Sequence, residues 1–285
     1  MVRTTILLGA LTGIIMAMGQ WIGGTHGMTI AFVIAVVMNF GSYWFSDKIV
    51  LAAYSAREVT EAEAPMLYRI VHNLALRARM PMPRLYILPQ DAPNAFATGR
   101  NPQHAAVAVT EGLMRLMNER EITGVLAHEL GHVQNRDILI SSIAATLAGV
   151  IVHVASMAQW AAMFGGFRRS DNEEGGGGGG TLGLILMAIL APLAATVIQM
   201  AISRTREFAA DEAGAKMAGD PLGLAAALRK LGMASERIPL DASPQTSHLF
   251  IVSPLSGASF ARLFSTHPPL EERIERLERL AGVRA

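Results

Sequence analysis

Leu126-Ala127-His128-Glu129-Leu130-Gly131-His132 is the stretch around which the rest of the chain is arranged. Its two histidines are four residues apart, so on a helix they lie about 40° apart around the axis and about 6 Å along it, close enough to share one metal ion. Glu129 lies beside them and could take a proton from water. This combination is typical of metal-assisted hydrolysis, most often of a peptide bond. Because so short a pattern also occurs by chance in unrelated helices, the interpretation depends on its surroundings.

The flanking sequence predicts that the motif lies in the middle of a helix. Asn118 with Glu121 three residues later has the form of an N-terminal capping box. Apolar residues then recur at helical spacing: Ile122, Val125, Leu126, Leu130 and Val133. Gly131 costs up to about 1 kcal/mol in a helix interior compared with Ala. We therefore expect another part of the chain to pack closely against that face.

The composition indicates a membrane protein. Of 285 residues 51% are hydrophobic and only 16% are charged, and the mean hydropathy is +0.34, whereas soluble domains carry roughly 25% charged residues. The net charge of +1 and the lack of basic runs give no sign of a nucleic-acid partner. The chain has no cysteine, so any metal must be bound by histidine and carboxylate side chains.

Four apolar segments predict four transmembrane helices. Ile6 to Ile22 and Met28 to Phe45 form a predicted hairpin within residues 1–46; the first segment could instead be a signal peptide, but its cleavage signals are poor and a second span follows at once. Asn39 is expected to hydrogen-bond between packed helices. Spans three and four lie within 138–202, separated by a glycine-rich loop at 165–181, and the lone His153 in span three is expected to pack or hydrogen-bond and not to bind metal.

An even number of spans places both termini and the motif on one side of the membrane. Basic residues flank the spans mainly on that side, against Arg168 and Arg169 in the glycine-rich loop. In a bacterial inner membrane this side is the cytoplasm. We therefore expect the lipid bilayer to be a partner, with the N-terminus, the C-terminus and the active site cytoplasmic.

Residues 47–137 and 203–285 are predicted to form one catalytic domain in two parts. In the first part we expect helices at 60–79 and 111–117, strands at 84–88 and 105–110, and between the strands either an edge strand within 91–99 or an ordinary hairpin. An edge strand beside a metal-binding helix can pair with an extended peptide. In the second part we expect helices at 203–218, 221–231 and 268–281, the last with Leu270, Ile274, Leu277 and Leu280 as its buried stripe.

Two histidines leave a zinc site incomplete, because catalytic sites usually have three protein ligands and an open position. Glu207 and Asp211 lie at i and i+4 on the first helix of the second part, on the same side of the membrane as the motif. Glu207 could bind the metal, and Asp211 could accept a hydrogen bond from a ligating imidazole. Without the upstream motif, two solvated carboxylates would be the better interpretation.

The sequence resembles the HtpX-type membrane metalloproteases, which are related to the CAAX prenyl proteases and belong to the gluzincins. Four pieces in the family's order carry the resemblance: Asn94-Ala95-Phe96-Ala97-Thr98-Gly99, His128-Glu129-Leu130-Gly131-His132 with Asn135-Arg136-Asp137, Arg206-Glu207-Phe208-Ala209-Ala210-Asp211, and Ser265-Thr266-His267-Pro268-Pro269. They span most of the chain, so the resemblance is more specific than any single motif.

The resemblance implies a mainly α integral membrane protein with a cytosolic α+β zincin-like domain that holds one Zn²⁺ per chain. By it His128, His132 and Glu207 are the zinc ligands, Glu129 is the general base, and Asp211 is the partner of a ligating histidine. The implied function is cleavage of misfolded or damaged membrane proteins in quality control and stress response. The substrates would be proteins or peptides.

Five further residues are candidates for contacts with the substrate or the transition state. His267 could donate to the tetrahedral oxyanion or anchor the last helix, and we favour anchoring. Arg204 and Arg206 could serve the oxyanion or pair with Asp211. Asn94 and Phe96 belong to the expected edge strand region.

Two other functions compete with a membrane-anchored zinc endopeptidase. An intramembrane protease would place the motif at mid-bilayer depth, but its charged flanks would then cost about 2.5 to 3.5 kcal/mol per central charge. A membrane scaffold or holdase with a structural metal site would not need a general base and would complete the metal coordination with protein ligands. The sequence favours catalysis.

Overall fold

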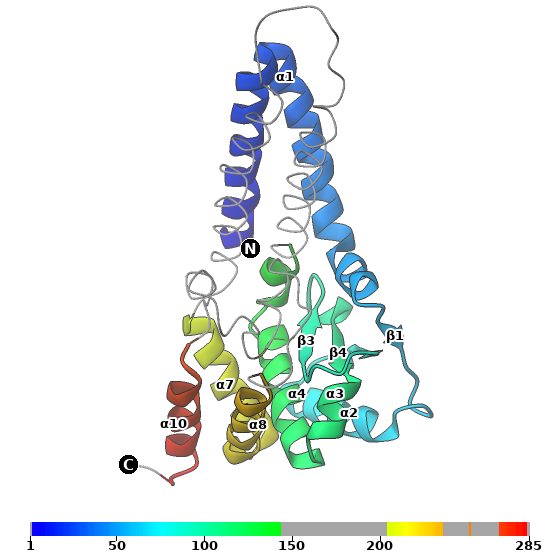
Figure 1. The fold of residues 1–285 in the computed structure, drawn as a ribbon, viewed down its shortest axis with the longest axis vertical. Helices are drawn as coiled ribbons and strands as arrows, with labels where there is room; N and C mark the ends of the chain where they lie inside the picture. Colours follow the sequence, from blue (N-terminus) through cyan, green and yellow to red (C-terminus); the bar gives the residue numbers. More distant parts are fainter. Residues whose placement is uncertain (1, 144–203, 236–250, 252–267, 284–285) are drawn as a thin grey trace, which may run out of the picture.

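A computed structural model describes residues 2–143, 204–235, 251 and 268–283 (Figure 1). In these ranges the chain is mainly helical and contains one small mixed sheet. The helices are α1 (Val2–Ala53), α2 (Pro65–Ala78), α3 (Glu111–Leu116), α4 (Glu119–Gln134), α7 (Arg204–Ala218), α8 (Pro221–Ser235) and α10 (Leu270–Leu280), with a 3₁₀ turn at Pro102–His104. The strands are β1 (Arg57–Glu58), β2 (Arg84–Leu88), β3 (Ala95–Thr98) and β4 (Ala106–Thr110).

Helix α1 forms two antiparallel legs at one end of the molecule (Figure 1). The legs are separated by a kink at Gly23 and Gly24, where Gly24 has a φ of 57° that suits glycine. Asn39 joins the legs, because its Nδ2 donates to Thr12 Oγ1 at 2.9 Å, so the predicted packing role of Asn39 is confirmed. Within the described residues, Gly23–Ala53 is long and apolar enough to cross a membrane.

The third and fourth predicted spans lie almost entirely outside the described residues. Residues 138–143, at the predicted start of span three, are helical. His153, the glycine-rich loop at 165–181 and the whole fourth span fall in the part of the chain that the structure does not describe.

The four strands are arranged in the order β1-β2-β4-β3. Strands β2 and β4 are parallel, and β3 pairs antiparallel with β4 at one edge of the sheet, Phe96 lying opposite Ala108. The predicted strands at 84–88 and 105–110 are confirmed. The sequence left an edge strand or an ordinary hairpin open for 91–99, and β3 has both features, because it lies at the edge of the sheet and forms an antiparallel hairpin with β4. The short strand β1, antiparallel to β2, was not expected from the sequence.

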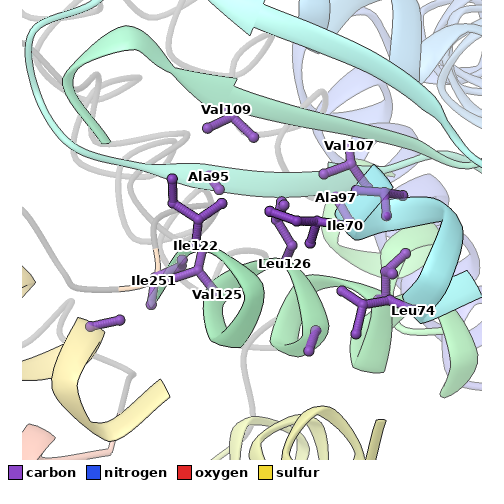
Figure 2. Close-up of a cluster of buried hydrophobic side chains, with 14 of the residues drawn as sticks. Ile70, Leu74, Ala95, Ala97, Val107, Val109, Ile122, Val125, Leu126 and Ile251 are labelled. Atoms are coloured by element: carbon purple, nitrogen blue, oxygen red, sulfur yellow. The ribbon is translucent and has the colours of Figure 1, made fainter. Parts of the chain in front are cut away.

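Each face of the sheet has its own hydrophobic cluster. Figure 2 shows the larger one, in which Ala95 and Ala97 of β3 lie with Val107 and Val109 of β4 over side chains of α2 and α4. On the opposite face, Phe96, Tyr86 and Leu88 pack with Val50 and Leu51 from the last turns of α1. The sheet is therefore held between the helix that carries the histidine motif and the end of the long N-terminal helix.

Helix α4 is at the centre of the helical layer because its backbone approaches two other helices at glycines. A Cβ on Gly131 would lie 2.8 Å from the carbonyl oxygen of Ala210 in α7, and one on Gly214 of α7 would lie 2.7 Å from the amide nitrogen of His128. A Cβ on Gly124 would lie 2.4 Å from the amide nitrogen of Leu224 in α8. The close packing that we expected at Gly131 is confirmed, and its partner is α7.

Two sequence predictions need correction. The first amphipathic helix begins at Pro65 and not at Thr60, because Thr60 and Glu63 form a separate turn in which the Thr60 amide donates to the Glu63 carboxylate at 2.8 Å. In α10, Leu280 is 51% exposed, whereas Arg273 is completely buried beside Leu277. The predicted leucine stripe of this helix is therefore wrong at one end and omits its most buried polar residue.

Candidate metal centre

Three side chains that could hold a metal ion meet where α4 and α7 pack together. The capping box of Asn118 and Glu121 starts α4 and places His128 and His132 one turn apart on its inner face. Glu207 comes from the first turn of α7. The Nε2 of His128 lies 3.8 Å from Glu207 Oε2, and the Nε2 of His132 lies 3.5 Å from Glu207 Oε1.

This cluster fits a zinc ion by its geometry and its donor chemistry. One ligand atom from each of the three residues lies within 4.8 Å of the others. Two imidazoles and one carboxylate are a standard donor set for catalytic zinc, and three protein ligands leave one position for water. The described residues thus offer three ligands of the right kind in one place.

Each histidine has a carboxylate at its other ring nitrogen. His128 Nδ1 lies 2.9 Å from Asp211 Oδ1, and His132 Nδ1 lies 3.5 Å from Asp137 Oδ2. Asp137 reaches this place because Arg136 adopts a left-handed conformation with φ 60° just after α4, which turns the chain back toward His132. A carboxylate at 2.9 Å, as Asp211 is, fixes the orientation of the His128 ring, whereas Asp137 Oδ2 approaches His132 without forming a hydrogen bond. Both Nε2 atoms lie toward Glu207. The role of Asp211 was expected from the sequence, whereas Asp137 was part of the resemblance without an assigned role.

Arg273 of α10 is the second residue of the site that the sequence did not reveal. It is buried, and its guanidinium donates to both carboxylate oxygens of Asp211 at 2.8 and 2.7 Å and to the Ile251 carbonyl at 3.0 Å. It also lies 3.5 Å from Glu207 Oε2. A buried arginine requires such partners. Its position among the apolar residues of α10 could have indicated a buried arginine, but the sequence did not show which carboxylate it contacts.

Glu129 is buried beside the histidines and is held by the edge strand. Its Oε2 accepts a hydrogen bond from the backbone amide of Ala97 in β3 at 2.9 Å. Burial raises the pKa of Glu129 to about 7, and the positive charge of His132 opposes this rise. A carboxyl with a pKa near neutrality can both accept and return a proton, as a general base requires.

Burial and neighbouring charges also shift the pKa values of His128, His132 and Asp211. Burial lowers the pKa of His128, which favours the neutral imidazole that binds metals. Burial would also lower the pKa of His132, but Asp137 and Glu207 outweigh it and the result is a rise to about 9. Burial alone would raise the pKa of Asp211, but the charge and hydrogen bonds of Arg273 bring it below its ordinary value.

The remaining sequence candidates lie in different places. Arg204 is exposed at the start of α7, Arg206 is partly buried, and the guanidinium that pairs with Asp211 belongs to Arg273. Asn94 is buried and accepts a hydrogen bond from the Ile251 amide at 3.3 Å. Phe96 is buried in the cluster on the opposite face of the sheet, so the structure does not bring its side chain to the histidines. His267 lies outside the described residues.

Comparison with known proteins gives consistent matches over most of the chain. A family model described as Peptidase family M48 matches residues 61–281. "Protease HtpX homolog" of Syntrophobacter fumaroxidans (strain DSM 10017 / MPOB) is 63% identical over 276 residues, which is 96% of this chain and 97% of that protein. "Protease HtpX homolog" of Aquifex aeolicus (strain VF5) is 54% identical over 272 residues, 95% of this chain and 90% of that protein.

A solved structure has the same general fold. The crystal structure of S. mikatae Ste24p superimposes with a TM-score of 0.53 at 21% sequence identity. The match covers 98% of this chain and 65% of that chain. At this identity the likeness concerns the fold alone.

Proposed function

The chain belongs to peptidase family M48 and is a membrane-associated metalloprotease, and from this premise we propose that it is a zinc-dependent endopeptidase with His128, His132 and Glu207 as the metal ligands and Glu129 as the general base. One observation carries the proposal. The three ligand atoms lie within 4.8 Å of one another, next to a buried carboxylate that is not one of them. A structural metal site has no need of that fourth group.

The residues of the chain divide the chemistry among them. Bound at the three ligands, a zinc ion supplies Lewis acidity toward water and the peptide carbonyl. Glu129 accepts the proton of the attacking water and later returns it to the leaving amine, while its Oε2 is held by the Ala97 amide. Asp211 holds the His128 imidazole in position, Arg273 holds Asp211, and Asp137 lies 3.5 Å from the ring of His132.

Strand β3 supports the proposal that the substrate binds in an extended form. It is an edge strand, and the amide of Ala97 points away from β4 toward Glu129. A peptide that pairs with this edge would lie along the metal site. An endopeptidase is expected to cleave a peptide bond within such an extended segment, whose side chains alternate between its two faces.

We further propose four transmembrane spans, with the site on the cytoplasmic side and membrane proteins as substrates. The apolar segments at 138–164 and 182–202 and the basic residues that flank the spans support this topology. The domain division at 1–46, 47–137, 138–202 and 203–285 follows from it. The charged ends of α4, including Glu119 and Arg120, favour this location over an intramembrane protease.

Two substitutions at the centre test the assignment of roles. Glu129→Gln should leave one zinc per chain while lowering turnover by roughly 10² to 10⁴, because it removes the base and not a ligand. Glu207→Gln should lower zinc content itself, because it removes a charged ligand. Metal analysis and cleavage of an unfolded protein such as casein measure both. Loss of zinc in Glu129→Gln, with zinc and activity retained in Glu207→Gln, would show that the roles are wrong.

The topology has its own test. Protease added to the outside of spheroplasts should cut the loop at Gly175 to Gly180 and spare residues 84–137. If the loop is protected while a control protein on the outside of the membrane is digested, the span count or the orientation is wrong.

A further inference from the structure

A pocket of about 600 Å³ lies between the end of the membrane-spanning part of α1 and the sheet. One side is aromatic and comes from α1, where Phe40, Trp44 and Phe45 are 62%, 42% and 47% exposed. The other side is polar and is formed by Lys48, Arg84, Arg100 and His104 together with Asp47. The pocket is therefore apolar toward the span and cationic toward the sheet.

The charges of this pocket are not balanced within the described residues. Asp47 is the single carboxylate among its lining residues, and it pairs with Arg84 at 3.0 Å. Arg84 also donates to the hydroxyl of Tyr86 at 3.0 Å, so its guanidinium already has partners in α1 and in β2. Across the described part of the chain, Lys48 and Arg100 form no ion pair with a carboxylate.

Lys48 and Arg100 instead lie over aromatic rings of α1. The guanidinium carbon of Arg100 is 4.6 Å from the centre of the Trp44 ring, and Lys48 Nζ is 5.8 Å from the centre of the Phe45 ring. These contacts hold both cations at the level where the apolar surface of α1 ends. An anion bound here would be met by two positive charges and would lie next to exposed aromatic surface.

The loop that carries Arg100 has a fixed geometry. Gly99 has a φ of 130°, and a Cβ on it would lie 2.3 Å from the carbonyl oxygen of His104. Only glycine fits this conformation, and Arg100 follows directly from it. The same loop begins at the end of β3, the strand whose Ala97 amide holds Glu129.

We propose that this pocket binds the headgroup of an anionic phospholipid, with the phosphate between Lys48 and Arg100 and the glycerol and upper acyl chain along Trp44 and Phe40. A phospholipid matches both halves of the pocket, whereas a free anion would not cover the exposed apolar surface of Phe40, Trp44 and Phe45. The exposed apolar residues that continue along α1, such as Val36 and Val37, place the apolar half against acyl chains. The bound lipid would hold the β3 loop at the membrane surface.

Trp44 provides a direct measurement of lipid binding. The full-length Glu129→Gln protein, with Trp21 and Trp160 replaced by phenylalanine, is placed in phosphatidylcholine nanodiscs that contain a small fraction of brominated lipid. Brominated phosphatidylglycerol should quench Trp44 more than brominated phosphatidylcholine does. Each Lys or Arg near an anionic surface strengthens lipid association about five-fold, so two give a preference of about 25-fold at low salt, and the preference should decrease as salt rises.

Matched variants separate this site from general electrostatics. Lys48→Gln with Arg100→Gln should reduce the preference to nearly none, and Lys48→Arg with Arg100→Lys should keep most of it. Arg69→Gln with Lys216→Gln removes the same charge from exposed surface pairs elsewhere and should leave it unchanged. Circular dichroism checks that each variant is folded.

Three results would overturn the proposal. One is equal quenching by the two lipids in the protein with both cations. Another is displacement of the brominated lipid by inorganic phosphate at matched ionic strength, which would show a simple anion site. The third is a combination of two observations: the Lys48→Gln, Arg100→Gln variant keeps its lipid preference, and the same two changes, made in the protein that keeps Glu129, weaken the cleavage of acidic peptides. That combination would assign the pocket to substrate. Because quenching needs no catalysis, failure here is independent of the proposed peptidase activity.

Discussion

Replacing Arg273 by methionine should destabilise the protein strongly, although α10 contains none of the proposed metal ligands. Methionine keeps much of the length of the side chain but removes both hydrogen bonds to Asp211 and the one to the Ile251 carbonyl. The Asp211 side chain is only 4% exposed, so its charge would remain buried with His128 as its partner. Breaking one side of a buried ion pair costs about 3 to 5 kcal/mol, which corresponds to about 6 to 20 °C in Tm.

Thermal unfolding of the purified protein in detergent, with zinc removed and then restored, measures this effect. Asp211→Asn combined with Arg273→Met should lose less stability than the sum of the two single changes, because no unpaired charge stays buried. Arg279→Met is the control, since Arg279 is an exposed arginine of the same helix. The reasoning is refuted if Arg273→Met and Arg279→Met shift the Tm equally, or if the two changes at Asp211 and Arg273 are simply additive.

Three further predictions follow from the packing and charges around the histidines. Gly214→Ala should lower the free energy of unfolding by about 1 to 3 kcal/mol and weaken zinc binding, since its Cβ would lie 2.7 Å from the His128 amide nitrogen. Gly41→Ala is the control, because there is open space around Gly41. Equal melting temperatures of the two variants would contradict the close contact between α4 and α7. Asp137→Asn should weaken zinc binding about 10 to 100-fold in a competition assay, and an unchanged affinity would mean that the 3.5 Å approach to His132 is not functional. The raised pKa of His132, about 9 without metal, means that this ring is protonated at neutral pH and must lose its proton to bind. Calorimetry in buffers of different ionisation enthalpy should therefore detect about one proton released per zinc and an affinity that rises about tenfold per pH unit up to about pH 9; no dependence on buffer would contradict the prediction.

Local patterns in the sequence predicted much of the fold. The capping box of α4 and the strands β2 and β4 depend on neighbouring residues or on short spacings, and all were found. The sequence also predicted a strand within 91–99 but left its edge position open. His128 and His132 share a face for the same reason. Glu207 required an argument about topology, because α7 is far from α4 in the sequence, and the structure brings these three side chains together.

These local patterns did not predict contacts between elements that are distant in the sequence. Arg273 lies on the buried side of α10, but apolar periodicity describes only the leucines of that side and says nothing of a guanidinium that meets Asp211, 62 residues earlier. Phe96 alternates with Ala95 and Ala97, and the sequence could not indicate which face of β3 points toward α4. The amide of Ala97 has no side-chain signature at all, so its hydrogen bond to Glu129 could not be predicted.

The last turns of α1 limit how the peptidase can be separated from its membrane-spanning helix. Val50 and Leu51 are 2% and 5% exposed because they fill the face of the sheet that carries Phe96 and Leu88. A fragment that starts after Ala53 would lose both side chains, each worth about 1.5 to 3 kcal/mol when fully buried, out of a total stability of about 5 to 15 kcal/mol. It would also present Phe96 to water on the back of β3, at the edge where strands from other molecules can add. A water-soluble version therefore has to keep residues 47–53 and replace the apolar surface before them, because the last turns of the membrane helix belong to the core of the peptidase.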